Sequence, residues 1–91
     1  MSVVKHLRIH GRVQGVGYRY SLAEIAAAHG ITGWARNRRD GTVEAMISGK
    51  DTTVESIIAW ARRGPDGAAV TNVEIADAEG SFSGFETRPT A

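Results

Sequence analysis

The sequence predicts an α+β fold of the ferredoxin-like class, in which two helices cover one face of an antiparallel sheet. Three observations predict it. First, two stretches carry apolar residues at the spacing of a helix. Second, the stretches before and after them alternate polar and apolar residues, as strands do. Third, an Asp-Gly pair joins two of these strand-like stretches. The resulting order, β-α-β-β-α-β, is that of the split β-α-β sandwich. A chain of 91 residues has room for one such domain, so we assign residues 1–91 to a single domain.

The first strand and the first helix are indicated by their apolar spacing. Residues 6–10, "HLRIH", alternate polar and apolar side chains, which directs Leu7 and Ile9 toward a core. The helix that follows carries four residues at i, i+3, i+4 and i+7: Leu22, Ile25, Ala26 and His29. Gly30 is expected to end this helix, because glycine readily adopts the backbone angles found just beyond a helix C-terminus.

A hairpin is predicted in the middle of the chain. Residues 31–37, "ITGWARN", form its first strand, and Asp40 with Gly41 forms the turn, which is the only role we assign to this pair. Residues 42–48, "TVEAMIS", return beside the first strand. Three alternate residues of the return strand are expected on one side of the sheet: Val43, Ala45 and Ile47.

The second half of the chain repeats the order of helix and strand. Thr52 and Glu55 have the spacing of a capping box, which opens a helix. The apolar face of this helix comprises Val54, Ile57, Ile58 and Ala61. Residues 70–78 form the next strand. Residues 84–90 are expected to add a short strand at an edge of the sheet, where Pro89 is tolerated.

Composition and charge exclude several classes of protein. A formal net charge of +1 is too small for a protein whose main partner is nucleic acid or an anionic membrane. The chain has no cysteine, and no stretch approaches the ~20 apolar residues of a membrane helix. The first residues lack the apolar segment of a signal peptide. We therefore expect a cytoplasmic protein, with a monomer as the plainest state.

The histidines do not predict a metal site. His6 and His10 share one face of a strand but lie four residues apart, and no third ligand accompanies them. A solvated sheet face explains both residues. We expect neither a metal ion nor another cofactor.

The stretch "GRVQGVGYR", from Gly11 to Arg19, sets three glycines between a strand and a helix. A helix N-terminus offers unpaired N–H groups and partial positive charge, and glycines let successive N–H groups converge on an anion. Arg19 lies where the helix starts, and its planar guanidinium suits a phosphate or carboxylate. Because no nucleotide-binding motif is present, this loop predicts a site for one small anion. A tight turn beside a surface arginine is the alternative that these features leave open.

The predicted topology brings a second segment to this loop. The first strand-helix-strand unit is expected to be a right-handed crossover, so its two strands run parallel and end at the same edge of the sheet. The second of these strands ends at Asn37, whose carboxamide would then face the anion site. An amide both donates and accepts hydrogen bonds, so it can orient a water molecule. Without the topology, Asn37 would be explained by the preference of asparagine for turns.

Five further residues are expected to be structural. Arg36, Arg38 and Arg39 form a basic cluster, for which a solvated hairpin is the simplest explanation. They could also attract anionic substrates, an effect that salt would suppress. Trp34 and Trp60 are expected in the core or at its edge.

Two stretches of the chain resemble the acylphosphatase family. The pattern of that family runs roughly G-x-V-Q-G-V-x-[FY]-R and then G-W-V-x-N-x-x-D-G-x-V-E. The corresponding stretches here read "GRVQGVGYR" and "GWARNRRDGTVE". The one clear departure is Ala35 in place of the usual valine, at a position concerned with packing. The resemblance extends over nearly the whole chain and is least distinct from Ala78 onward.

The resemblance implies a function and a division of roles. It implies hydrolysis of small-molecule acyl phosphates to a carboxylate and inorganic phosphate, without a metal ion or a covalent phosphoenzyme. Arg19 would bind the phosphoryl group, and Asn37 would orient the attacking water. The backbone amides that would hold the phosphoryl group are those of Gln14, Gly15, Val16, Gly17 and Tyr18.

Two other classes of function compete with this interpretation. A non-catalytic module that binds phosphate or another small anion would keep Arg19 and could lose Asn37, whereas this chain has both. An RNA-binding sheet needs aromatic residues in its central strands, and "HLRIH" and "TVEAMIS" contain none. The enzyme is therefore the favoured interpretation.

Overall fold

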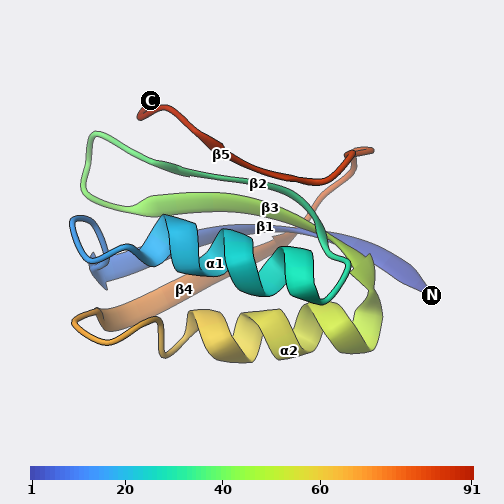
Figure 1. The fold of residues 1–91 in the computed structure, drawn as a ribbon, viewed down its shortest axis with the longest axis horizontal. Helices are drawn as coiled ribbons and strands as arrows, with labels where there is room; N and C mark the ends of the chain where they lie inside the picture. Colours follow the sequence, from blue (N-terminus) through green and yellow to red (C-terminus); the bar gives the residue numbers. More distant parts are fainter.

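The computed structural model describes residues 1–91 and contains one five-stranded sheet and two helices (Figure 1). The elements, in chain order, are β1 (Ser2–Arg12), α1 (Tyr18–Ala28), β2 (Thr32–Asn37), β3 (Val43–Lys50), α2 (Asp51–Ala61), β4 (Ala69–Asp77) and β5 (Phe85–Arg88). Both helices lie on the same face of the sheet, whose strand order is β4-β1-β3-β2-β5 (Figure 1). The predicted α+β class and element order are confirmed. Neither helix is long and apolar enough to cross a membrane.

Strands β4, β1, β3 and β2 form the predicted antiparallel sheet, and the additional strand β5 makes the five-stranded sheet mixed. β1 pairs antiparallel with β3 and β4, and β2 pairs antiparallel with β3, but β5 pairs parallel with β2. The connectivity explains the difference. β4 is antiparallel to β1, so it ends where β1 and β2 begin. β5 follows β4 in the chain and pairs with the side of β2 that does not face β3. It therefore starts beside the start of β2 and must run parallel to it. The predicted additional edge strand is confirmed.

The capping box predicted for the second helix is wrong. α2 begins at Asp51, directly after β3, with Lys50 at the N-cap and no side-chain cap. The Asp51 carboxylate instead accepts the Thr52 N–H at 2.8 Å, and its charge suits the positive end of the helix. Because the strand leads into the helix without a loop, the helix begins one residue before Thr52.

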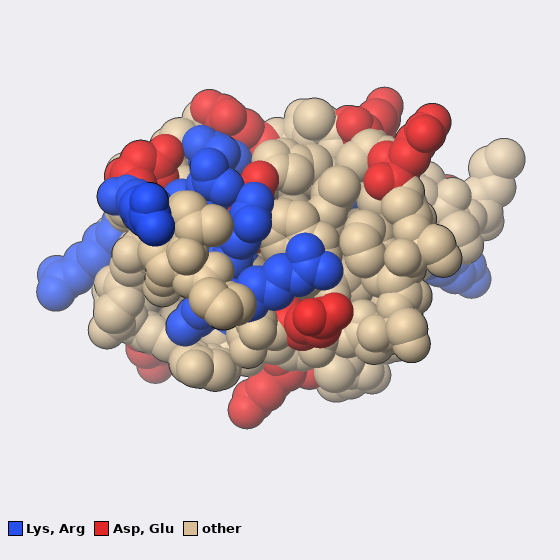
Figure 2. Space-filling view, turned by 90° about the horizontal axis from the view of Figure 1, so that it is seen from above, with Lys and Arg blue, Asp and Glu red and all other residues tan.

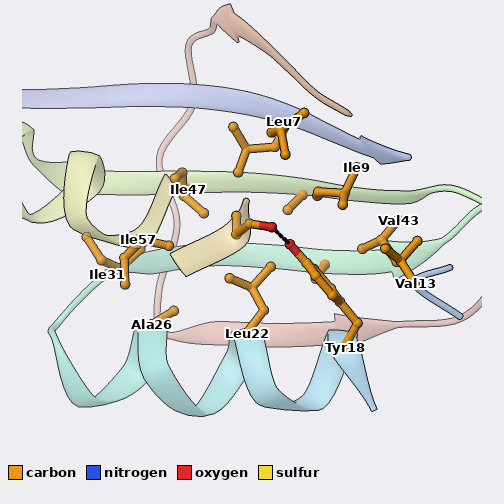
Figure 3. Packing of buried hydrophobic residues seen from close by; sticks show 14 of the residues in the cluster. Leu7, Ile9, Val13, Tyr18, Leu22, Ala26, Ile31, Val43, Ile47 and Ile57 are labelled. Atoms are coloured by element: carbon orange, nitrogen blue, oxygen red, sulfur yellow. Dashed lines mark hydrogen bonds between the residues drawn. The ribbon is translucent and has the colours of Figure 1, made fainter. Parts of the chain in front are cut away.

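The core lies between the two helices and the sheet (Figure 3). Leu7 and Ile9 of β1 and three residues of β3 are fully buried, as their alternation predicts. The predicted helix faces contribute Leu22, Ala26, Val54, Ile57 and Ala61. Two members of those faces, Ile25 and Ile58, are half-buried against this cluster. His29 is exposed, because α1 ends at Ala28 and the chain turns away from the core there.

Tyr18 joins the start of α1 to the end of α2. Its ring is 1% exposed and lies 5.4 Å from the ring of Trp60, which packs at the edge of the core as predicted. Its hydroxyl donates to the Ala61 carbonyl at 2.7 Å (Figure 3). Burial raises the pKa of the Tyr18 phenol well above its ordinary value, so the group stays a donor. This contact fixes the first turn of α1, where the glycine-rich loop ends.

Replacing Tyr18 by Phe removes this hydrogen bond without removing the ring. We expect Tyr18→Phe to lower the free energy of unfolding by about 1–3 kcal/mol, because the Ala61 carbonyl loses a buried donor. The measurement is urea denaturation followed by fluorescence. Tyr20→Phe is the matched control, since Tyr20 is 62% exposed and should change stability little. Equal effects of the two substitutions would contradict the anchoring role of Tyr18.

Candidate active site

A pocket of about 210 Å³ lies where β1 and β2 end. It is lined by Val13, Gly15, Gly17, Tyr18, Arg19, Tyr20 and Asn37. These residues come from the loop after β1, the first turn of α1 and the last residue of β2. The predicted meeting of the glycine-rich loop with Asn37 is therefore present in the structure.

The loop presents backbone N–H groups that have no partner in the chain. Gly15 and Gly17 both adopt φ of +75°, the left-handed region that other residues rarely enter. A Cβ at either position would meet nothing within 4 Å, so these glycines are needed for their backbone angles and not for space. The amides of residues 14–17 donate to no other group of the chain, and no side chain caps the first turn of α1. Unpaired donors thus gather at the positive end of a helix.

Arg19 is half-buried at the edge of this loop and is held by β5. One of its terminal nitrogens, Nη1, donates to the Arg88 carbonyl at 2.8 Å. Its Nε is buried and has no acceptor in the chain. A buried donor without a partner costs about 1–3 kcal/mol, so such groups usually serve a ligand or water. One guanidinium nitrogen, Nη1, is therefore held by the protein, while Nε and Nη2 have no partner within the chain.

Asn37 contributes a free carboxamide to the same pocket. The backbone carbonyl of Asn37 accepts a hydrogen bond from the Ala91 N–H at 3.0 Å, which continues the pairing of β2 with the C-terminal segment. Its side chain makes no hydrogen bond within the chain, although it lines the pocket. The backbone of Asn37 is thus fixed from the β5 side while its amide group remains available to a ligand or to water.

The side chain of Gln14 joins the loop to the β2–β3 hairpin. Its Nε2 donates to the carbonyls of Arg38 and Thr42 at 2.7 and 2.9 Å. Sequence analysis assigned only the backbone amide of Gln14 to the site and missed this role. The signal was a long polar side chain within an otherwise small and apolar loop. The two hydrogen bonds fix the distance between the loop amides and Asn37, which directly precedes Arg38.

Two members of the basic cluster next to Asn37, Arg36 and Arg38, are half-buried and pair with Glu44. Arg36 Nε and Arg38 Nη1 lie 2.7 and 3.3 Å from Glu44 Oε1, and His6 Nε2 lies 2.7 Å from Oε2. These side chains lie on the face of the sheet opposite the helices. Only Arg39 is exposed. Figure 2 shows basic side chains gathered, with acidic ones among them, toward the end of the molecule that carries this hairpin.

Trp34 also lies on this outer face and not in the core cluster. The guanidiniums of Arg36 and Arg88 lie 4.9 and 4.7 Å from its ring, and they leave it 8% exposed. Alternation along β2 explains the position, because Ala35 takes the inward side. Trp34, expected in the core or at its edge, is thus buried outside the core cluster by stacking between two arginines.

Burial and hydrogen bonding act in opposite directions on the Glu44 carboxylate. Burial by itself would raise its pKa, but the bonds from His6 and Arg36 outweigh burial and hold the pKa below its ordinary value. Glu44 is thus ionised at neutral pH and offsets part of the positive charge of Arg36 and Arg38. The structure groups no three His, Asp or Glu side chains in a way that could hold a metal ion.

The fold and the pocket together define a class: a small α+β protein with unpaired backbone donors where a glycine-rich loop enters a helix. A sequence profile of the acylphosphatase family, described as "Acylphosphatase", matches residues 5–87. The chain therefore belongs to the acylphosphatase family.

Relatives and solved structures agree with this assignment. The chain is 52% identical over 90 residues to an acylphosphatase from Acidovorax sp. (strain JS42), covering 98% of this chain and 93% of that protein. The structure of an acylphosphatase from Coxiella burnetii has a TM-score of 0.92 at 32% identity, covering 96% of this chain and 93% of that one. The Bacillus subtilis acylphosphatase structure has a TM-score of 0.90 at 28% identity, covering 97% and 99%.

Two substitutions of Gln14 test whether it holds the hairpin. We expect Gln14→Leu to lower the free energy of unfolding by about 1–3 kcal/mol, because two hydrogen bonds are lost. Gln14→Glu should cost more at neutral pH, since it turns a carboxylate toward two carbonyl oxygens. That environment raises the pKa of the new carboxyl in the folded state, so the extra cost should shrink as the pH falls. Urea denaturation at several pH values is the measurement, and equal, pH-independent losses would contradict the contact.

Acid destabilisation should depend on Glu44. Because its pKa is lower in the folded state than its ordinary value, the Glu44 carboxylate stabilises the fold above that value. This stabilisation is lost as the pH falls through the lowered pKa. We expect stability to fall less steeply between neutral pH and about pH 3 in Glu44→Gln than in the original protein. Glu55→Gln, at an exposed glutamate on α2, is the control and should leave the slope unchanged.

Proposed function

We propose that this chain is an acylphosphatase that hydrolyses the carboxyl–phosphate bond of acyl phosphates, with Arg19 and Asn37 as catalytic residues. Membership of the acylphosphatase family supports the reaction. One observation carries the assignment to this site: unpaired loop amides, the unpartnered Nε of Arg19 and the free carboxamide of Asn37 border one pocket.

The phosphoryl group occupies the loop in this proposal. The amides of residues 14–18 and the N-terminus of α1 hold its oxygens, and Arg19 donates from the side through guanidinium nitrogens that lack a partner in the chain. These donors are fixed before the substrate arrives, because Tyr18 anchors the helix turn and Arg88 holds the guanidinium. Fixed donors stabilise the charge that develops on a transferring phosphoryl group.

Asn37 orients the attacking water. The water oxygen forms a bond to phosphorus while the bond from phosphorus to the acyl oxygen breaks, and its electron pair leaves on the carboxylate. The proton of the water passes to an oxygen of the phosphoryl group, so the products are a carboxylate and dihydrogen phosphate. A carboxylate is a good leaving group, and no general acid is required. We infer that the reaction needs no metal ion.

A non-catalytic module for inorganic phosphate is the second candidate. The unpaired amides and Arg19 would suit it equally well. The free carboxamide of Asn37 favours the enzyme, because a module that only binds phosphate has no need of a group that orients water.

We infer that residues 1–91 act as one unit and as a monomer. Arg19, its partner Arg88 and Asn37 all come from this chain, so the site is complete without a second copy. Sedimentation of the purified protein tests the monomer. A cytoplasmic location stays a prediction, which cell fractionation tests.

The decisive measurement is hydrolysis of benzoyl phosphate in EDTA. We expect fast turnover by the original protein and a loss of at least about 10²–10³-fold in kcat for Arg19→Ala, because a fixed charge-stabilising donor is removed. Asn37→Ala should lose turnover to a similar extent but keep the inhibition constant for inorganic phosphate within about threefold.

Matched controls separate the site from general effects. Arg8→Ala removes an arginine from the outer face, and Asn72→Ala removes an exposed asparagine from β4. Both should retain normal rates. Normal turnover by Asn37→Ala would refute the water-orienting role. Absence of turnover in the original protein, with phosphate still raising its thermal midpoint, would favour the anion-binding module.

A further inference from the structure

Tyr20 is an exposed aromatic residue at the mouth of the pocket. Its side chain is 62% exposed, and the only other exposed large hydrophobic residues are Met1 and Ile75, since the rest are buried or half-buried. Tyr18, two residues earlier, is buried because successive helical positions turn by about 100°, which directs Tyr20 away from the core. The Tyr20 hydroxyl makes no hydrogen bond within the chain. Neither core packing nor a hydrogen bond within the chain therefore accounts for an aromatic residue at this position.

The surroundings of Tyr20 give it a functional position. It lines the pocket together with Arg19 and Asn37, and the guanidinium carbon of Arg19 lies 5.1 Å from the centre of its ring. The other apolar side chains that line the pocket, Val13 and Tyr18, are each 1% exposed. Tyr20 is thus the one large apolar surface that a molecule in the pocket can reach from the solvent side.

We propose that the ring of Tyr20 binds the acyl group of the substrate and favours flat, unsaturated acyl groups over acetyl. This inference rests on the proposed function. With the phosphoryl group held by the loop amides, the acyl group must extend outward from the pocket. There, an aromatic face gives an aroyl group a stacking partner, which a methyl group uses far less. Tyr20 is then a residue for specificity, distinct from the residues that hold the phosphoryl group.

The contact with Arg19 suggests a different role that the experiment must separate. If Tyr20 only orients the guanidinium, its loss would impair the phosphoryl site, and all substrates would suffer equally. A residue that binds the acyl group affects one substrate more than another and leaves phosphate binding unchanged. The ratio of two substrates and the inhibition constant of inorganic phosphate therefore distinguish the two roles.

The test compares benzoyl phosphate with acetyl phosphate in Tyr20→Ala, Tyr20→Leu and Tyr20→Phe. We expect the ratio of their kcat/KM values to fall about fivefold in Tyr20→Ala and less in Tyr20→Leu, mainly through KM for benzoyl phosphate. Tyr20→Phe keeps the ring and should keep the ratio. Ile75→Ala is the matched control, because it removes an exposed apolar residue from β4 at the opposite edge of the sheet.

Each outcome decides the proposal. A lowered ratio in Tyr20→Ala, with an unchanged phosphate inhibition constant, supports acyl binding. An equal loss on both substrates, a raised phosphate inhibition constant or an unchanged ratio would overturn it. If the original protein hydrolyses neither substrate above background, the proposed function itself is wrong, and the role of Tyr20 falls with it.

Discussion

The candidate active site depends on one constraint of the sheet. β1 and β2 both run antiparallel to β3, so they end at the same edge and deliver the glycine-rich loop and Asn37 to one place. Registers along β3 are fixed because its inward residues must stay in the core, and a slip of one residue would expose them. Burial of apolar residues in the core thereby sets the positions of the loop amides and of Asn37, which do not belong to the core.

Two contacts reduce the remaining freedom at this edge. Gln14 bonds two carbonyls of the β2–β3 hairpin, and the Arg88 carbonyl holds the guanidinium of Arg19. Both join segments that are far apart in the sequence, and both act on the backbone of the partner. The loop amides, the cation and the carboxamide are therefore held relative to one another, which fixed-donor stabilisation of a phosphoryl group requires.

The sequence was informative wherever periodicity or a local motif carried the signal. Alternation in β1 and β3 predicted their inward residues, and the crossover rule predicted that the loop and Asn37 would meet. It was less informative where distant segments decide the outcome. The parallel direction of β5 follows from where β4 ends, and the partners of Gln14 and Arg19 lie on elements whose pairing no local pattern reveals. Trp34 was expected in the core or at its edge, because hydrophobicity alone does not show that it lies on the outer face of β2.

At this end of the molecule, Glu44 pairs with two of the arginines but not with Arg19. Glu44 pairs with Arg36 and Arg38 on the outer face, so its single negative charge offsets part of their positive charge. On the pocket side, Arg19 has no carboxylate partner, and its Nε has no acceptor at all. The unpaired donors of the loop and of Arg19 lower the free energy of unfolding. The hydrogen bond of the buried Tyr18 to Ala61, at the same turn of α1, offsets this loss. In the proposed function, the bound anion would pair with these donors, which the fold already holds in position.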